Sequence, residues 1–282
     1  PAVAAAEGVY QSPRDFRGNR FVYAVLSPRA RGLSVGVNVN PDQHCDYGCA
    51  YCEVERSSPP PGGRLDVEEM ATELEAMLDL VHSGRLREVP GYERIPEALL
   101  ALRHVTLSGD GEPTLSPDFL EAVETVVHQR ARGPFFKIVL LTNGSGLGTP
   151  RVEEALRLLT ARDEIWAKLD GGTQAYVDRV NQPGCSIEDM LARILNLARR
   201  RPVVIQSLFP SLQGAEPPRE EIEAYANRLR VLKQSGAQIP LVQIYSATHP
   251  MPRRDCGHLP LRSLSQIARR VREVAGLQAE VF

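Results

Sequence analysis

The sequence predicts an α/β fold: an open, partial (β/α)6 barrel of the TIM type preceded by an N-terminal extension. Strand-like and helix-like segments alternate from residue 33 onward, which favours a parallel sheet with helices outside. Six such pairs are fewer than the eight of a closed TIM barrel. A doubly wound open sheet is the alternative, and in both folds the active edge lies at the carboxyl ends of the strands.

The strands are predicted from short runs rich in Val, Ile and Leu that end in polar residues or glycine. These runs are Leu33–Asn40, His104–Ser108, Phe136–Thr142, Glu164–Leu169, Pro202–Phe209 and Leu241–Ser246.

Amphipathic segments between these runs predict the helices Val67–Ser83, Pro117–Arg132, Pro150–Arg162, Ile187–Arg200, Arg219–Ser235 and Leu261–Ala275. Asp66 and Ser186 are suited to cap helix N-termini, and Asp189 completes a near-capping box with Ser186. Glycines follow three of the predicted helices, at Gly84, Gly236 and Gly276.

Two divisions of the chain are expected: an N-terminal extension over residues 1–32 and a core over residues 33–282. Three prolines followed by two glycines predict a loop over Arg56–Arg64. The segment Arg85–Leu100 reads as an insertion before the second strand.

Composition indicates an ordinary globular protein. Among 282 residues, 43% are hydrophobic and 24% are charged, and the formal net charge of −2 gives no long-range attraction to nucleic acid. Neither a membrane-spanning run nor a signal peptide is evident. Three of the five cysteines lie within eight residues, which is typical of a metal site in a reducing compartment, so we expect a cytoplasmic protein.

The clustered cysteines are Cys45, Cys49 and Cys52, in the loop that follows the first strand. Thiolates are soft ligands that favour iron–sulfur clusters, zinc or Cu(I). At these spacings three thiolates are able to hold one 4Fe–4S cluster and leave its fourth iron open to a ligand. The alternatives are a zinc site completed by His44 or a distant cysteine, and unrelated buried cysteines.

The pattern Cys45-x-x-x-Cys49-x-Tyr51-Cys52 resembles the signature of the radical S-adenosylmethionine (SAM) superfamily. This resemblance implies a partial barrel of the radical SAM type. It also implies a 4Fe–4S cluster on the three cysteines that cleaves SAM reductively to methionine and a 5′-deoxyadenosyl radical, which abstracts hydrogen from a substrate. The three cysteines are then both metal ligands and catalytic residues, and Tyr51 is expected beside the cofactor.

The resemblance extends to the ends of later strands. The Gly109-Asp110-Gly111-Glu112 segment resembles the superfamily's GGE segment, which implies that it binds the SAM ammonium group through backbone carbonyls. Polar residues at other strand ends are further candidates for SAM contacts: Asn143, Lys168, Asp170, Gln206, Ser207 and Tyr245. Gln243 and Tyr245 share one face of their strand, and one of them is expected to line the barrel.

Two other features fall in loops at the predicted active edge. Cys185 and Cys256 either donate a hydrogen atom, anchor a further group or have no function, and the last reading is the commonest one for a half-buried cysteine. The basic loop His249–His258 is either a binding element for an anionic group or a solvated loop.

Four segments look like the branch of radical SAM proteins related to the wyosine-forming tRNA enzymes: Leu26–Asn38, Ser108–Leu115, Trp166–Asp170 and Val242–Tyr245. Archaeal members of that branch carry a second cluster on three further cysteines upstream. No cysteine precedes Cys45, so that second cluster is not expected.

Three hypotheses follow for the function. The first is a radical SAM enzyme acting on a small molecule or a modified base, with wyosine-like tRNA modification possible but not favoured. The second is an activase that installs a glycyl radical on a partner protein. The third is a non-catalytic metal-binding protein. For the first two, the resemblance implies a reductant such as flavodoxin or ferredoxin as partner.

Overall fold

The computed structural model describes residues 16–54, 56, 63–247 and 253–282. The chain forms two compact units. The first contains Pro1–His44, Pro59–Leu141 and Pro150–Asp163, and the second contains Cys45–Ser58, Thr142–Thr149 and Glu164–Phe282. Nowhere in the described residues does a helix combine the length and apolar character that a bilayer crossing requires.

The strands of the first unit are β1 (Val22–Ser27), β2 (Gly32–Asn38), β3 (Leu102–Ser108) and β4 (Lys137–Thr142), in that spatial order. β2, β3 and β4 are parallel, as predicted, whereas β1 pairs antiparallel with β2. β1 lies within the predicted N-terminal extension, where we expected no strand. Its side chains are mostly buried, so it belongs to the core of this unit.

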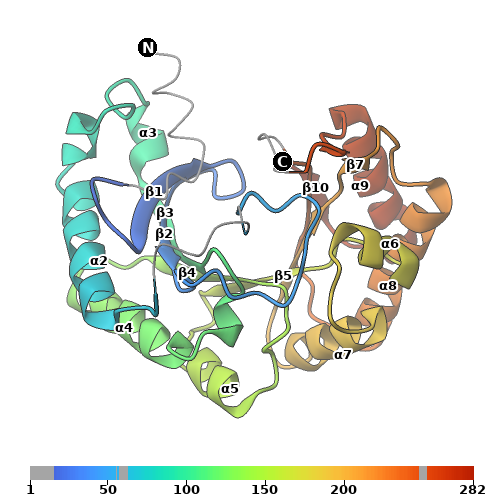
Figure 1. The fold of residues 1–282 in the computed structure, drawn as a ribbon, viewed down its shortest axis with the longest axis horizontal. Coiled ribbons are helices and arrows are strands. Elements are labelled where there is room, and N and C mark those ends of the chain that lie inside the picture. Colours follow the sequence, from blue (N-terminus) through green and yellow to red (C-terminus); the bar gives the residue numbers. More distant parts are fainter. Residues whose placement is uncertain (1–15, 55, 57–62, 248–252) are drawn as a thin grey trace. The chain divides into compact units, whose positions relative to one another are not determined.

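Helices α2 (Val67–His82), α4 (Phe119–Arg132) and α5 (Pro150–Arg157) accompany these strands (Figure 1). The carboxylate of Asp66 accepts hydrogen bonds from the backbone N–H groups of Glu68 and Glu69, which confirms the predicted cap. α5 ends earlier than predicted, because Asp163 binds the N–H and hydroxyl of Thr160 and turns the chain. The predicted insertion contains two short helices, η1 (Arg85–Glu88) and α3 (Glu97–Leu100).

Four parallel strands form the sheet of the second unit: β5 (Glu164–Lys168), β6 (Val204–Leu208), β8 (Val242–Tyr245) and β10 (Ala279–Val281). Their register aligns one residue from each strand in a continuous row: Lys168, Gln206, Gln243 and Glu280. β7 (Ser211–Leu212) and β9 (Cys256–Gly257) form a separate antiparallel pair.

The helices of this unit are α6 (Gln174–Val180), α7 (Ile187–Ala198), α8 (Arg219–Gln234) and α9 (Leu261–Ala275) (Figure 1). Ser186 and Asp189 form the predicted capping box of α7. Gly276 ends α9 in the left-handed conformation that glycine adopts without strain. α6 was not predicted, because it is short and starts directly at the Thr173 cap after β5.

Candidate functional site

The cysteine loop belongs to the second unit and is held there by main-chain hydrogen bonds. The N–H of Gly48 donates to the carbonyl of Asn181 at 2.9 Å, and the N–H of Ala50 donates to the carbonyl of Val180 at 2.7 Å. Both acceptors lie at the carboxyl end of α6. The loop is therefore anchored to a helix end rather than to a strand, and the unpredicted α6 is the element that positions it.

An apolar cluster lies under the same loop. Tyr47, Val177, Ile187 and Met190 form its buried centre, and Cys45 and Cys49 pack against it. Burial is the main reason that the pKa of Cys49 rises to about 12. Among the described residues, no three His, Cys, Asp or Glu side chains are grouped so as to hold a single metal ion. A 4Fe–4S cluster makes a different demand, because it takes each thiolate on a separate iron.

Each sulfur of the loop has a nitrogen donor from a different part of the second unit. Nδ2 of Asn143 lies 3.8 Å from the Cys45 sulfur, and Nδ2 of Asn181 lies 3.4 Å from the Cys49 sulfur. Nη2 of Arg56 lies 4.0 Å from the Cys52 sulfur. Sulfur ligands of an iron–sulfur cluster carry negative charge, so N–H donors around them match the donor set that such a cluster needs.

Asp170, at the end of β5, is the buried centre of a hydrogen-bond network; it is 1% exposed. Its Oδ1 accepts from the backbone N–H of Leu208 at 2.7 Å and lies 3.1 Å from Nζ of Lys168. Its Oδ2 accepts from Nδ2 of Asn181 at 2.7 Å and from the Tyr51 hydroxyl. The carboxylate is thus fully engaged by the protein, and it links β5 to the cysteine loop.

Lys168 is the cation of this network. Its Nζ donates to the Tyr245 hydroxyl at 2.9 Å and lies 5.0 Å from the ring centroids of both Tyr51 and Tyr245. Burial opposes the charge, but Asp170 and Tyr245 more than offset it, so the pKa of Lys168 lies above its ordinary value. Lys168 is therefore an ammonium group at neutral pH.

Gln206 and Gln243 continue the row across the sheet. Nε2 of Gln206 donates to Oε1 of Gln243 at 3.3 Å, and both side chains are almost fully buried. Oε1 of Gln206 has no hydrogen-bond partner among the described residues. Buried amide oxygens are normally paired, so this atom is open to a donor that the protein does not supply.

Ser207 does not join this group, although we had placed it with Gln206. Its hydroxyl contacts the Leu169 carbonyl and the Tyr225 hydroxyl of α8, each at 2.6 Å. Successive strand residues point to opposite faces, so Gln206 faces away from α8 while Ser207 faces the helix. Ser207 is a packing residue that connects β6 to α8.

In the first unit, the Gly109–Glu112 segment follows β3 and packs against the chain that leads to the cysteines. The N–H of Glu112 donates to the His44 carbonyl at 2.9 Å. A Cβ on Gly111 would lie 1.8 Å from that carbonyl oxygen, so only glycine fits. Asp110 exchanges two hydrogen bonds with the Asn38 side chain, at 2.8 and 3.0 Å.

Two side chains in this region are buried. The Glu112 carboxylate is 2% exposed and accepts from the N–H and hydroxyl of Thr114, so it caps the short helix η2 (Pro113–Leu115). Asn40 is fully buried beside Gly109 and Gly111, and neither polar atom of its amide has a partner among the described residues. Asn40 was not predicted, because nothing local in the sequence distinguishes it from a loop asparagine.

The remaining predicted residues are dispersed. Asn143, at the end of β4, contacts Asp46 at 3.0 Å as well as the Cys45 sulfur. Cys185 packs against the Tyr47 cluster, whereas Cys256 is buried in β9. Residues 249–252 of the predicted basic loop lie outside the described residues, and Arg253 pairs with Asp255.

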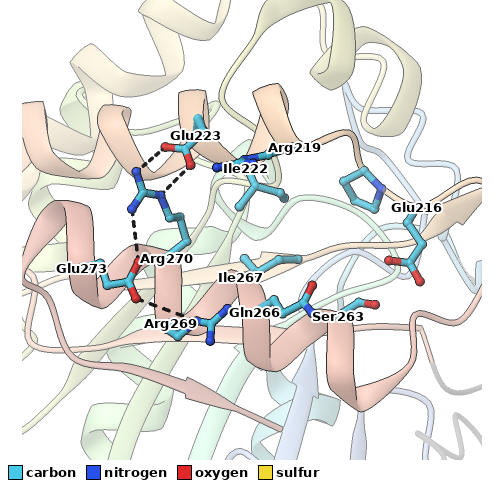
Figure 2. Close-up of a pocket in the computed structure, with 11 residues that line it drawn as sticks. Glu216, Arg219, Ile222, Glu223, Ser263, Gln266, Ile267, Arg269, Arg270 and Glu273 are labelled. Carbon is cyan, nitrogen blue, oxygen red and sulfur yellow. Dashed lines mark hydrogen bonds and ion pairs between the residues drawn. The ribbon is translucent and has the colours of Figure 1, made fainter.

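A separate cavity of about 540 Å³ lies between α8 and α9 (Figure 2). Four of its charged side chains pair with one another: Arg270 with both Glu223 and Glu273, and Arg269 with Glu273. None of the described residues named above as contacts of the cysteine loop lines this cavity. The candidate site is therefore the cysteine loop and its surroundings.

Comparison with known proteins identifies the family and the fold of the chain. The family model of the Radical SAM superfamily matches residues 39–216. A UPF0026 protein of Helicobacter pylori strain 26695 is 26% identical over 57% of this chain and 46% of its own length. A UPF0026 protein of Synechocystis is 27% identical over 61% of this chain and 57% of its own length. The chain thus spans about half the length of the curated relatives it matches.

Solved structures share the fold at low sequence identity. TYW1 with a lysine-pyruvate adduct bound aligns with a TM-score of 0.53 and 17% identity, over 92% of this chain and 85% of the other. Streptococcus suis SuiB bound to S-adenosylmethionine aligns with a TM-score of 0.57 and 14% identity, over 90% and 52%. The predicted fold class, a partial TIM-like barrel of the radical SAM type, is confirmed. The chain belongs to the Radical SAM superfamily, whose members are enzymes that use a 4Fe–4S cluster and SAM.

Proposed function

We propose that Cys45, Cys49 and Cys52 hold the 4Fe–4S cluster and leave one iron free for SAM. The observation that carries the proposal is the cysteine loop itself: three thiols from one anchored loop, each with an N–H donor beside its sulfur. When bound, the cluster supplies the electron for reductive cleavage of SAM. Because cysteine thiols stay reduced in the cytoplasm, the three thiols also support a cytoplasmic location for the protein.

For SAM itself, the first unit offers backbone groups at Gly109, Asp110, Gly111 and Glu112. The missing side chain at Gly111 supports a close approach of main chain, and the unpaired amide of Asn40 supports a polar ligand nearby. Such a segment suits the ammonium group of SAM, because carbonyl oxygens attract a cation without needing a charged side chain.

In the second unit, we propose that Lys168 recognises a carboxylate. Two of its three hydrogens are directed to Asp170 and Tyr245, which leaves one for an anionic ligand group. Gln206 offers its unpaired Oε1 to a hydroxyl or amine. Asp170 and Tyr51 then act by orienting Lys168 and Asn181, since each is occupied by other protein groups.

The substrate that best agrees with these features is a small molecule. A flavodoxin or ferredoxin supplies the electron that reduces the cluster. Wyosine-like tRNA base modification is the second candidate, favoured by the likeness to TYW1. The net charge of −2 gives that candidate no general attraction to RNA.

Anaerobic reconstitution tests the proposal. We expect about four irons and four sulfides per chain, and an electron paramagnetic resonance (EPR) signal of the reduced cluster that changes when SAM binds the open iron. Cys49→Ala should lose the cluster, whereas Cys256→Ala, a matched thiol removal in β9, should retain it. A zinc ion in the wild-type protein, or a cluster of normal content and normal SAM response in Cys49→Ala, contradicts the proposal.

A further inference from the structure

We propose that the side-chain amide of Asn181 is a positioning donor to the Cys49 sulfur that sets the potential at which the cluster is reduced. The inference rests on the proposed function, since it needs the cluster on Cys49. It adds a residue outside the cysteine motif and the strand ends, 132 positions along the chain from the cysteine it contacts.

The main chain of Asn181 is fixed on both sides. Its N–H donates to the Val177 carbonyl at 2.7 Å, which continues the hydrogen bonding of α6. Its carbonyl accepts from the N–H of Gly48 at 2.9 Å, in the middle of the cysteine loop. The same residue therefore anchors the loop and faces one of its sulfurs, so the amide and the thiol move together.

The side chain is also held. Asn181 is 2% exposed, and its Nδ2 lies 2.7 Å from Asp170 Oδ2 and 3.1 Å from the Tyr51 hydroxyl. Asp170 is in turn fixed by Leu208 and Lys168. These contacts point the NH2 group of Asn181, and not its oxygen, toward the loop, because the neighbouring carboxylate accepts only from a donor.

Reduction adds one electron to the cluster, and part of that charge resides on the cysteine sulfurs. An N–H donor at a sulfur stabilises the reduced state more than the oxidised state, so it raises the potential. Burial strengthens the effect. Asn181 makes the shortest of the three sulfur contacts, 3.4 Å against 3.8 Å for Asn143 and 4.0 Å for Arg56. It should therefore have the largest influence.

The test is an EPR-monitored redox titration of the reconstituted full chain. Asn181→Leu removes the donor at similar volume, Asn143→Leu removes the longer contact, and Asn196→Leu makes the same change at an exposed position on α7. We expect Asn181→Leu to lower the ratio of reduced to oxidised cluster about tenfold at fixed potential, which is about 59 mV for one electron. Asn143→Leu should shift it less, and Asn196→Leu should leave it unchanged.

Iron and sulfide content separates the possible results. A wild-type potential in Asn181→Leu with full cluster content overturns the inference and leaves the proposed function intact. A wild-type chain that assembles no cluster contradicts both. Should the leucine variant not fold, Asn181→Ala, which leaves a void instead of an apolar group facing Asp170, gives the same readout, and an unshifted potential there is equally decisive.

Discussion

The dipeptide Asp-Gly occurs at the end of a strand in each unit, and the two copies do different things. In the first unit, Asp110 shares two hydrogen bonds with one asparagine, and Gly111 lets main chain approach main chain. In the second unit, Asp170 is buried and accepts from four donors. In the first segment the close approach of the main chain matters most, whereas in the second the aspartate side chain makes the contacts. The shared Asp-Gly sequence does not reveal this difference.

The largest expected effect is on stability at the two aspartates. Asp170→Ala leaves the Lys168 ammonium buried without its carboxylate, which should lower the free energy of unfolding by about 3–5 kcal/mol. Asp110→Ala removes one side-chain hydrogen bond, from Asn38 at a half-buried position, and keeps the bond donated by its own N–H, so it should cost about 1.5 kcal/mol. Urea denaturation of the cluster-free chain measures both. Equal losses would remove the contrast between the two segments.

Alanine substitutions at glycine positions test how closely the main chain is packed in each unit. A Cβ on Gly111 meets the His44 carbonyl, and a Cβ on Gly172 meets the main chain of Tyr225 at 2.0 Å. Either alanine variant should cost about 1–3 kcal/mol through overpacking. Gly184→Ala is the control, because nothing lies within 4 Å of its added methyl group. Thermal unfolding compares the three, and a control as unstable as the others would refute the steric argument.

A smaller effect is expected at the hydroxyl that links the cysteine loop to Asp170. Tyr51→Phe keeps the ring beside Lys168 and removes both the charge-assisted hydrogen bond to Asp170 and the 3.1 Å contact with Asn181, for a loss of about 1.5–3 kcal/mol. Tyr23→Phe is a control in the first unit, where the hydroxyl forms a hydrogen bond with Ser108 at 3.2 Å. We expect the control to lose about 1 kcal/mol or less in the same denaturation assay.

The smallest effect concerns the two isolated cysteines. Cys256 is buried in β9, and Cys185 packs beside Tyr47 and lies 3.7 Å from Nη1 of Arg193, so replacing either by alanine removes only weak contacts. Both variants should cleave SAM at the wild-type rate, measured as 5′-deoxyadenosine formed with dithionite. Loss of cleavage in a folded variant would mean that its thiol takes part in the chemistry.

Local signals in the sequence predicted most of the fold. The six strands expected after residue 32 are confirmed to within two residues at each end, because buried parallel strands are dense in Val, Ile and Leu. β1 was missed within the supposed extension, and β10 was missed because three residues give too little periodicity. α6 was missed for the same reason: seven residues form barely two turns.

The site was predictable only where chemistry is encoded by spacing. The cysteine motif is local, so its position was found. Asn181 and Asn40 depend on contacts between distant segments, and a single asparagine in a loop carries no signal of such a contact. Ser207 was misplaced although strand alternation already separates it from Gln206, so that error lay in the interpretation and not in the sequence.

The most direct test of the central claim is SAM cleavage by the reconstituted, dithionite-reduced chain. We expect 5′-deoxyadenosine and methionine in equal amounts from the wild-type protein and from Cys256→Ala, and neither product from Cys49→Ala. Cleavage that survives the loss of Cys49, or a wild-type chain that carries a full cluster and forms no 5′-deoxyadenosine, would contradict it.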